Sequence, residues 1–191
     1  ANLTRDLVHT IRDVLTVAGI KRDEQKALAC LEAADLHFVL GVNHGVHEPL
    51  VGYLQEQLST WRLCLGADLI RVGTALHEAF ANAIEHGNLE LDSKLRNDPD
   101  GAYQRLASER RSQTPFRDRL VHVRARLSNE EAVITLRDQG PGFDPSVLPD
   151  PTDPENIGKI SGRGLLLIRT FMDDVYFNET GNEITLIKRR T

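Results

Sequence analysis

The sequence has little cysteine and no long apolar run. Its two cysteines, Cys30 and Cys64, stand far apart in 191 residues and form no C-x-x-C pair. Neither a disulfide framework nor a zinc site is therefore expected, and a reducing compartment is indicated. No apolar run approaches the length of a bilayer-spanning helix, and no signal peptide pattern begins the chain. We therefore expect a cytoplasmic protein with no membrane partner.

The sequence also lacks a basic excess. The formal net charge is −5, whereas a nucleic-acid-binding domain usually carries clustered positive charge. We therefore expect no nucleic-acid partner. What remains is the composition of a soluble globular domain, with 40% hydrophobic and 27% charged residues in a chain long enough for one sizeable core.

Apolar spacing divides the chain into an N-terminal helical segment, 1–31, and one larger domain, 32–191. The N-terminal segment is either a linker to a further, regulatory domain or a cap on this one. In the larger domain the pattern predicts a strand over 35–42, helices over about 49–61 and 67–86, a hairpin of strands over 121–127 and 132–138, a helix over 164–172, and strands over 175–178 and 183–189. A charged helical insertion at about 90–118 and a long loop over 139–162 separate these elements. The order predicts an α+β fold, a two-layer sandwich whose mixed, mostly antiparallel sheet is covered on one face by helices.

The first motif lies in the helix expected over 67–86. Glu78, Asn82 and Glu85 recur at i, i+4 and i+7, so they are expected on one face of that helix. A solvated polar stripe gives the same pattern. Asparagine in mid-helix argues against that simpler interpretation, because it is a poor helix former. Gly87 follows at the expected helix end, where glycine suits a C-terminal cap.

The second motif, Asp138-Gln139-Gly140-Pro141-Gly142-Phe143, follows the expected strand over 132–138. Glycines at a turn let backbone approach another group closely, and the aspartate offers an acceptor at a fixed position. A plain turn after a strand has the same composition.

The third motif is the glycine-rich run 158–164, which leads into a helix. Backbone N–H groups at a helix N-terminus suit phosphate, and Lys159 and Arg163 add positive charge. A flexible connector before a helix is the alternative interpretation.

In this order and spacing, the three motifs resemble the GHKL superfamily, which has the Bergerat ATP-binding fold and includes DNA gyrase, heat-shock chaperone ATPases and sensor histidine kinases. Within it, the sequence most resembles the anti-sigma-factor serine-protein kinases of the RsbW/SpoIIAB type, which the run 164–173 also fits. The resemblance covers roughly residues 32–190 and implies ATP and Mg²⁺ as cofactors.

The resemblance also implies roles for individual residues. Asn82 would hold Mg²⁺, an ion that prefers oxygen ligands. Glu78 would be the general base. Asp138 would accept a hydrogen bond from the adenine amino group. The remaining expected nucleotide contacts are Gly140 and Gly142 against the adenine ring, Thr185 near the adenine, Gly162 and Gly164 around the phosphates, and Lys159 and Arg163 at the γ-phosphate.

The sequence is compatible with three functions. The first is a serine/threonine-protein kinase that phosphorylates an anti-anti-sigma-like protein, binds a sigma factor, and forms a homodimer as its relatives do. The second is the catalytic domain of a histidine kinase, although no phosphoacceptor motif surrounds His9. The third is a nucleotide-gated protein-binding module without turnover.

Two smaller expectations concern residues outside the motifs. His44 and His47 form the only close histidine pair outside the helix over 67–86, and with no third ligand nearby in sequence we do not expect a metal site there. Trp61 and Phe80 are expected in the core.

Overall fold

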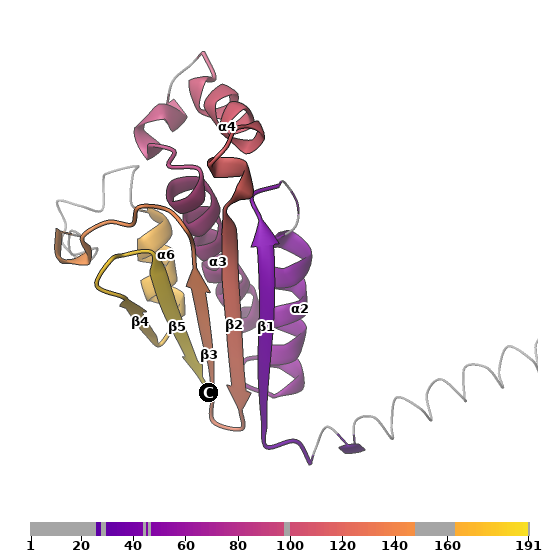
Figure 1. The fold of residues 1–191 in the computed structure, drawn as a ribbon. Helices are drawn as coiled ribbons and strands as arrows, with labels where there is room; N and C mark the ends of the chain where they lie inside the picture. The colour runs from indigo at the N-terminus through magenta and orange to yellow at the C-terminus, as the bar shows by residue number, and fades with distance from the viewer. Residues whose placement is uncertain are drawn as a thin grey trace, which may run out of the picture. The chain divides into compact units, whose positions relative to one another are not determined.

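The computed structural model describes residues 26–27, 30–43, 45, 47–97, 100–147 and 163–190 (Figure 1). The chain divides into two compact units, Ala1–Ala33 and Ala34–Thr191. Of the first unit only the last few residues are described, so the helices expected within 1–31 lie almost entirely outside the described residues. None of the described helices is long and apolar enough to cross a membrane.

One five-stranded sheet organises the second unit (Figure 1). Its strands are β1 (Ala33–Gly41), β2 (Leu120–Ser128), β3 (Glu131–Arg137), β4 (Asp174–Phe177) and β5 (Glu183–Arg189), in the spatial order β1-β2-β3-β5-β4. Strand β2 pairs antiparallel with β3, β3 with β5, and β4 with β5. Strand β1 runs opposite to β2 in Figure 1. The expected α+β sandwich is confirmed, and its described strands are all antiparallel rather than mixed.

Helices cover one face of this sheet. They are α2 (His47–Thr60), α3 (Ala67–Ala81) and α6 (Arg163–Phe171), and they lie behind the strands in Figure 1. Successive strand residues point to opposite faces, so β3 buries Ala132, Ile134 and Leu136 while the residues between them are more exposed. Phe80 is fully buried and Trp61 is buried, so the expectation that both belong to the core is confirmed.

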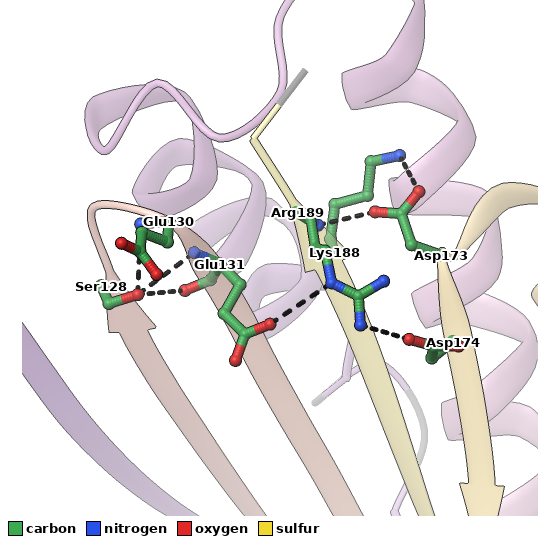
Figure 2. Close-up of polar contacts among 7 residues, drawn as sticks. All are labelled: Ser128, Glu130, Glu131, Asp173, Asp174, Lys188 and Arg189. Carbon is green, nitrogen blue, oxygen red and sulfur yellow. Dashed lines mark hydrogen bonds and ion pairs between the residues drawn. The ribbon is translucent and has the colours of Figure 1, made fainter.

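Polar contacts cross-link the sheet at the end where β3 begins and β5 finishes (Figure 2). The Arg189 guanidinium pairs with Asp174 and lies 3.7 Å from the Glu131 carboxylate, while its backbone N–H donates to Asp173 at 2.6 Å. Lys188, which is 7% exposed, lies 3.3 Å from the same Asp173 carboxylate. These contacts join β3, β5 and β4 side by side at this end of the sheet, in the register that the backbone pairing sets.

The charged insertion forms η2 (Ser93–Asn97), α4 (Ala102–Ser112) and η3 (Phe116–Asp118). The insertion therefore contains a helix, α4, and it makes specific contacts with the rest of the domain. Tyr103 is buried, and its hydroxyl donates to Glu85 at 2.6 Å. The Arg110 side chain donates to the carbonyls of Leu89 and Glu90, at 2.6 Å each. The insertion is therefore attached to the segment that follows α3.

Candidate functional site

The helix that carries the first motif changes its geometry at Asn82. Helix α3 ends at Ala81, and a π-helix, η1, runs from Asn82 to Asn88. The Leu89 N–H donates to the Ile84 carbonyl, an i→i+5 bond, at 2.9 Å. The prediction of one helix over 67–86 was wrong in this respect. Because a π-helical turn holds an extra residue, it rotates the following side chains, and such turns frequently occur at functional sites.

The π-helix separates the three polar residues that the sequence placed on one face. Glu78 and Asn82 both lie beside Gly164, since a Cβ at that glycine would stand 2.6 Å from Glu78 Oε2 and 3.9 Å from Asn82 Nδ2. Glu85 instead accepts the hydrogen bond from Tyr103 in α4. The shared face is therefore confirmed for Glu78 and Asn82 and is wrong for Glu85.

Gly164 brings the third motif to the first. It is the second residue of α6, after Arg163, whose side chain is exposed. Only a residue without a side chain fits against the Glu78 carboxylate here without displacing it. The expected phosphate-binding residues Lys159 and Gly162 lie outside the described residues.

The end of η1 meets the second motif. A Cβ on Gly87 would stand 2.4 Å from the Asp138 carboxyl carbon, and one on Gly140 would stand 2.2 Å from the Gly87 carbonyl oxygen. Gly87 lies inside η1 and does not have the positive φ of a left-handed cap. The expectation that it caps the helix was wrong, because its role in the structure is to leave space for Asp138.

Asp138 is a buried carboxylate immediately after β3. It is 8% exposed, and the Gly140 N–H donates to its Oδ1 at 2.8 Å. Burial raises the pKa of this carboxyl above its ordinary value, while the Gly140 N–H and the positive charge of Arg119 act in the opposite direction. A carboxylate held in this way can accept a hydrogen bond from a ligand amino group in a site with little water.

The two glycines of the second motif both pack against backbone of the protein itself. Gly142 has a φ of 74°, and a Cβ there would lie 1.9 Å from the Thr180 carbonyl oxygen. The Phe143 N–H donates to that same carbonyl at 3.0 Å. In this structure Gly140 and Gly142 therefore fix the turn after Asp138 against η1 and against the β4–β5 turn.

Thr185 does not lie with Asp138, Gly140 and Gly142. Its hydroxyl lies 3.2 Å from that of Thr135, on the face of the sheet that the helices leave uncovered, because Ile184 and Leu186 are the β5 residues that point to the core. Asn182 lies opposite Asp138, and the Asp138 N–H donates to the Asn182 carbonyl at 3.0 Å. Motif reasoning missed Asn182. The alternation along β5, extended one step back from Ile184, contains the signal that would have found it.

Within the described ranges, no group of three histidine, cysteine, aspartate or glutamate residues could hold an ion. The His47 ring lies 6.1 Å from those of His77 and Phe80, and His44 is outside the described residues.

The family that this architecture belongs to is identified by a direct match. Residues 47–188 match the model of the histidine kinase-like ATPase domain. The chain belongs to this family, and its fold is the GHKL ATPase fold. No curated protein matches the chain. Domains of this family bind ATP, generally with Mg²⁺.

The residues of this chain fit both ATP and Mg²⁺. Asn82 carries a side-chain amide oxygen and lies, like the Glu78 carboxylate, close to Gly164 at the start of α6. Oxygen ligands of this kind suit Mg²⁺ shared with phosphate. Asp138 supplies a buried acceptor for an amino group. η1 joins these two sets of residues, since Asn82 is its first residue and Gly87 touches Asp138.

Proposed function

We propose that this domain binds Mg²⁺-ATP and transfers the γ-phosphoryl group to a serine or threonine hydroxyl of a small partner protein of the anti-anti-sigma type. The observation that supports the proposal is the placement of Glu78 beside Asn82 and Gly164. It puts a carboxylate, a cation ligand and the N-terminal turn of α6 within one small region, and phosphoryl transfer requires a base, a cation and phosphate-binding groups together.

Each residue has a defined task in this proposal. The Asn82 amide oxygen holds the cation, and Asp138 accepts a hydrogen bond from the adenine amino group. When bound, ATP supplies the phosphoryl group. Glu78 accepts the proton of the attacking hydroxyl as its oxygen bonds to the γ-phosphorus, and the bond to the β–γ bridging oxygen breaks to leave ADP. The proposal assigns Arg163, with Lys159, to the γ-phosphate. A sigma factor would be the second partner, its binding controlled by the phosphorylation, and the working form would be a homodimer.

The first experiment is isothermal titration of ATP with and without Mg²⁺, on the wild type and on Asn82→Ala. Magnesium-dependent binding that loses its dependence in Asn82→Ala supports the proposal. The absence of ATP binding by the wild type refutes it.

The second experiment measures phosphotransfer from γ-labelled ATP to a small protein of the anti-anti-sigma type. Glu78→Gln should lower the transfer rate by about 10²–10⁴-fold, the usual contribution of a general base, with little change in ATP affinity. Glu85→Gln is the matched control, because Glu85 lies on the same helical segment but contacts Tyr103. Equal losses in both variants would refute the role of Glu78.

The same assay separates the alternatives. Acid-labile phosphate on a histidine would identify the catalytic domain of a histidine kinase. Tight magnesium-dependent ATP binding with no transfer to any partner would identify a nucleotide-gated binding module. Acid-stable phosphoserine or phosphothreonine is the result that the proposal expects.

A further inference from the structure

Asn88, the last residue of η1, joins this helix to the turn that follows Asp138. Its side chain is fully buried, and its Oδ1 accepts a hydrogen bond from the Gln139 N–H at 2.8 Å. This bond determines the orientation of the amide, because a backbone N–H can only donate. Nδ2 is also buried and has no hydrogen-bond partner among the described residues. Among the described residues, only the oxygen of this side chain is therefore used.

Gln139, whose N–H donates to Asn88, lies between Asp138 and Gly140. These residues form the turn that the proposed function assigns to the adenine base. Gln139 is held a second time by its own side chain, whose Oε1 accepts a hydrogen bond from the Leu120 N–H at 2.9 Å. Asn88 itself is held in place by Arg119, which donates to its carbonyl oxygen at 2.7 Å. The peptide that follows Asp138 therefore cannot move relative to η1 without breaking the Asn88 bond.

We propose that Asn88 is a positioning residue for base selectivity, which acts by fixing the Gln139 peptide and with it the direction of the Asp138 carboxylate. The inference rests on the proposed function, in which Asp138 accepts a hydrogen bond from the adenine amino group. Hydrogen bonds weaken steeply as their angle departs from linearity, and binding constellations need positions held within about 0.5 Å.

Selectivity depends on this geometry because of the chemistry of the two purines. Guanine carries a carbonyl oxygen where adenine carries the amino group, so a fixed carboxylate attracts adenine and repels guanine at that position. A carboxylate that can swing away loses both effects. In the proposed function the phosphate end of the site is formed by Asn82 and the start of α6, and Asn88 lies at the other end of η1.

The test compares the dissociation constants of Mg²⁺-ATP and Mg²⁺-GTP for the wild type, Asn88→Leu and Gln139→Ala. Leucine has nearly the shape of asparagine but removes the acceptor, together with the donor that has no partner. We expect Asn88→Leu to lower the preference for ATP over GTP by about tenfold or more, chiefly through weaker ATP binding. That loss corresponds to one charge-assisted hydrogen bond.

Gln139→Ala keeps the test valid if Asn88→Leu does not fold. The Gln139 side chain is exposed, so its truncation leaves the core intact while removing the bond to Leu120. A smaller fall in the same selectivity ratio, about two- to threefold, is expected. If Asn88 had a merely structural role, its substitution would weaken the binding of ATP and GTP equally. The ratio of the two dissociation constants would then stay unchanged.

The outcomes distinguish this inference from the proposed function. A wild type that does not bind ATP refutes the proposed function. A wild type that binds ATP without preference over GTP, or variants whose ratio equals that of a selective wild type, refute the inference and leave the proposed function standing.

Discussion

Gly87→Ala tests the geometry of the site with a single methyl group. A Cβ at this position would lie 2.4 Å from the Asp138 carboxyl carbon, and 2.5 and 2.6 Å from its two oxygens. The aspartate side chain is short, and the Gly140 N–H holds its Oδ1. The carboxylate must therefore move by about 1.1–1.6 Å to regain an ordinary contact distance of roughly 3.5–4.0 Å.

The expected loss of affinity follows from the bond that this movement breaks. A hydrogen bond to a charged group contributes about 1.5–3 kcal/mol. At about 1.4 kcal/mol for each tenfold change, ATP binding should weaken by roughly 10–150-fold. The affinity for inorganic triphosphate with Mg²⁺ should change little, because that interaction is expected at Asn82 and the start of α6.

The assay is isothermal titration, and Gly73→Ala is the matched control. Gly73 lies in α3, where a Cβ would meet only the flexible end of Gln55, at 2.2 Å from Nε2. The variant loses the bond from Gln55 to the Leu69 carbonyl but gains about 0.5–1 kcal/mol of helix propensity. Its ATP affinity should stay within about twofold of the wild type. ATP binding by Gly87→Ala that equals that of Gly73→Ala would refute the placement of Asp138 at the base.

Two further predictions concern stability. Because burial raises the pKa of Asp138, its ionised form destabilises the folded state at neutral pH, and stability is gained as the pH falls through the raised value. Asp138→Asn should therefore raise Tm at pH 7 while weakening ATP binding by about tenfold or more. The difference in Tm between the variant and the wild type should shrink on acidification. A lower Tm of the variant at pH 7 would contradict the cause assigned to the pKa shift. Tyr103→Phe removes the bond to Glu85 and should cost about 1.5–3 kcal/mol, measured by urea unfolding. An unchanged midpoint would show that the insertion is not attached to η1 through this bond.

The sequence by itself determined the fold class and most of its elements. Alternating apolar residues along β3 and β5 allow only one face toward the core, so the strands and their sides follow from the pattern. Helical spacing likewise predicted that Glu78 and Asn82 lie together, because residues four apart are neighbours on a helix surface. Motif order then pointed to the GHKL superfamily, which the match over residues 47–188 confirms.

Other features depended on contacts between segments far apart in the chain. A one-residue expansion of a helix has no pattern of its own, so η1 and the turning away of Glu85 toward Tyr103 could not be predicted from local spacing. The same holds for Gly87, which resembles a cap until Asp138 is seen against it.

The pairing of Asn88 with Gln139 joins residues 51 positions apart. A buried asparagine near a helix end has many potential partners, and only packing selects one of them. The sequence therefore determined which polar residues the domain carries, whereas the tertiary structure decided which of them lie together, because close approach between backbones is a property of the assembled layers.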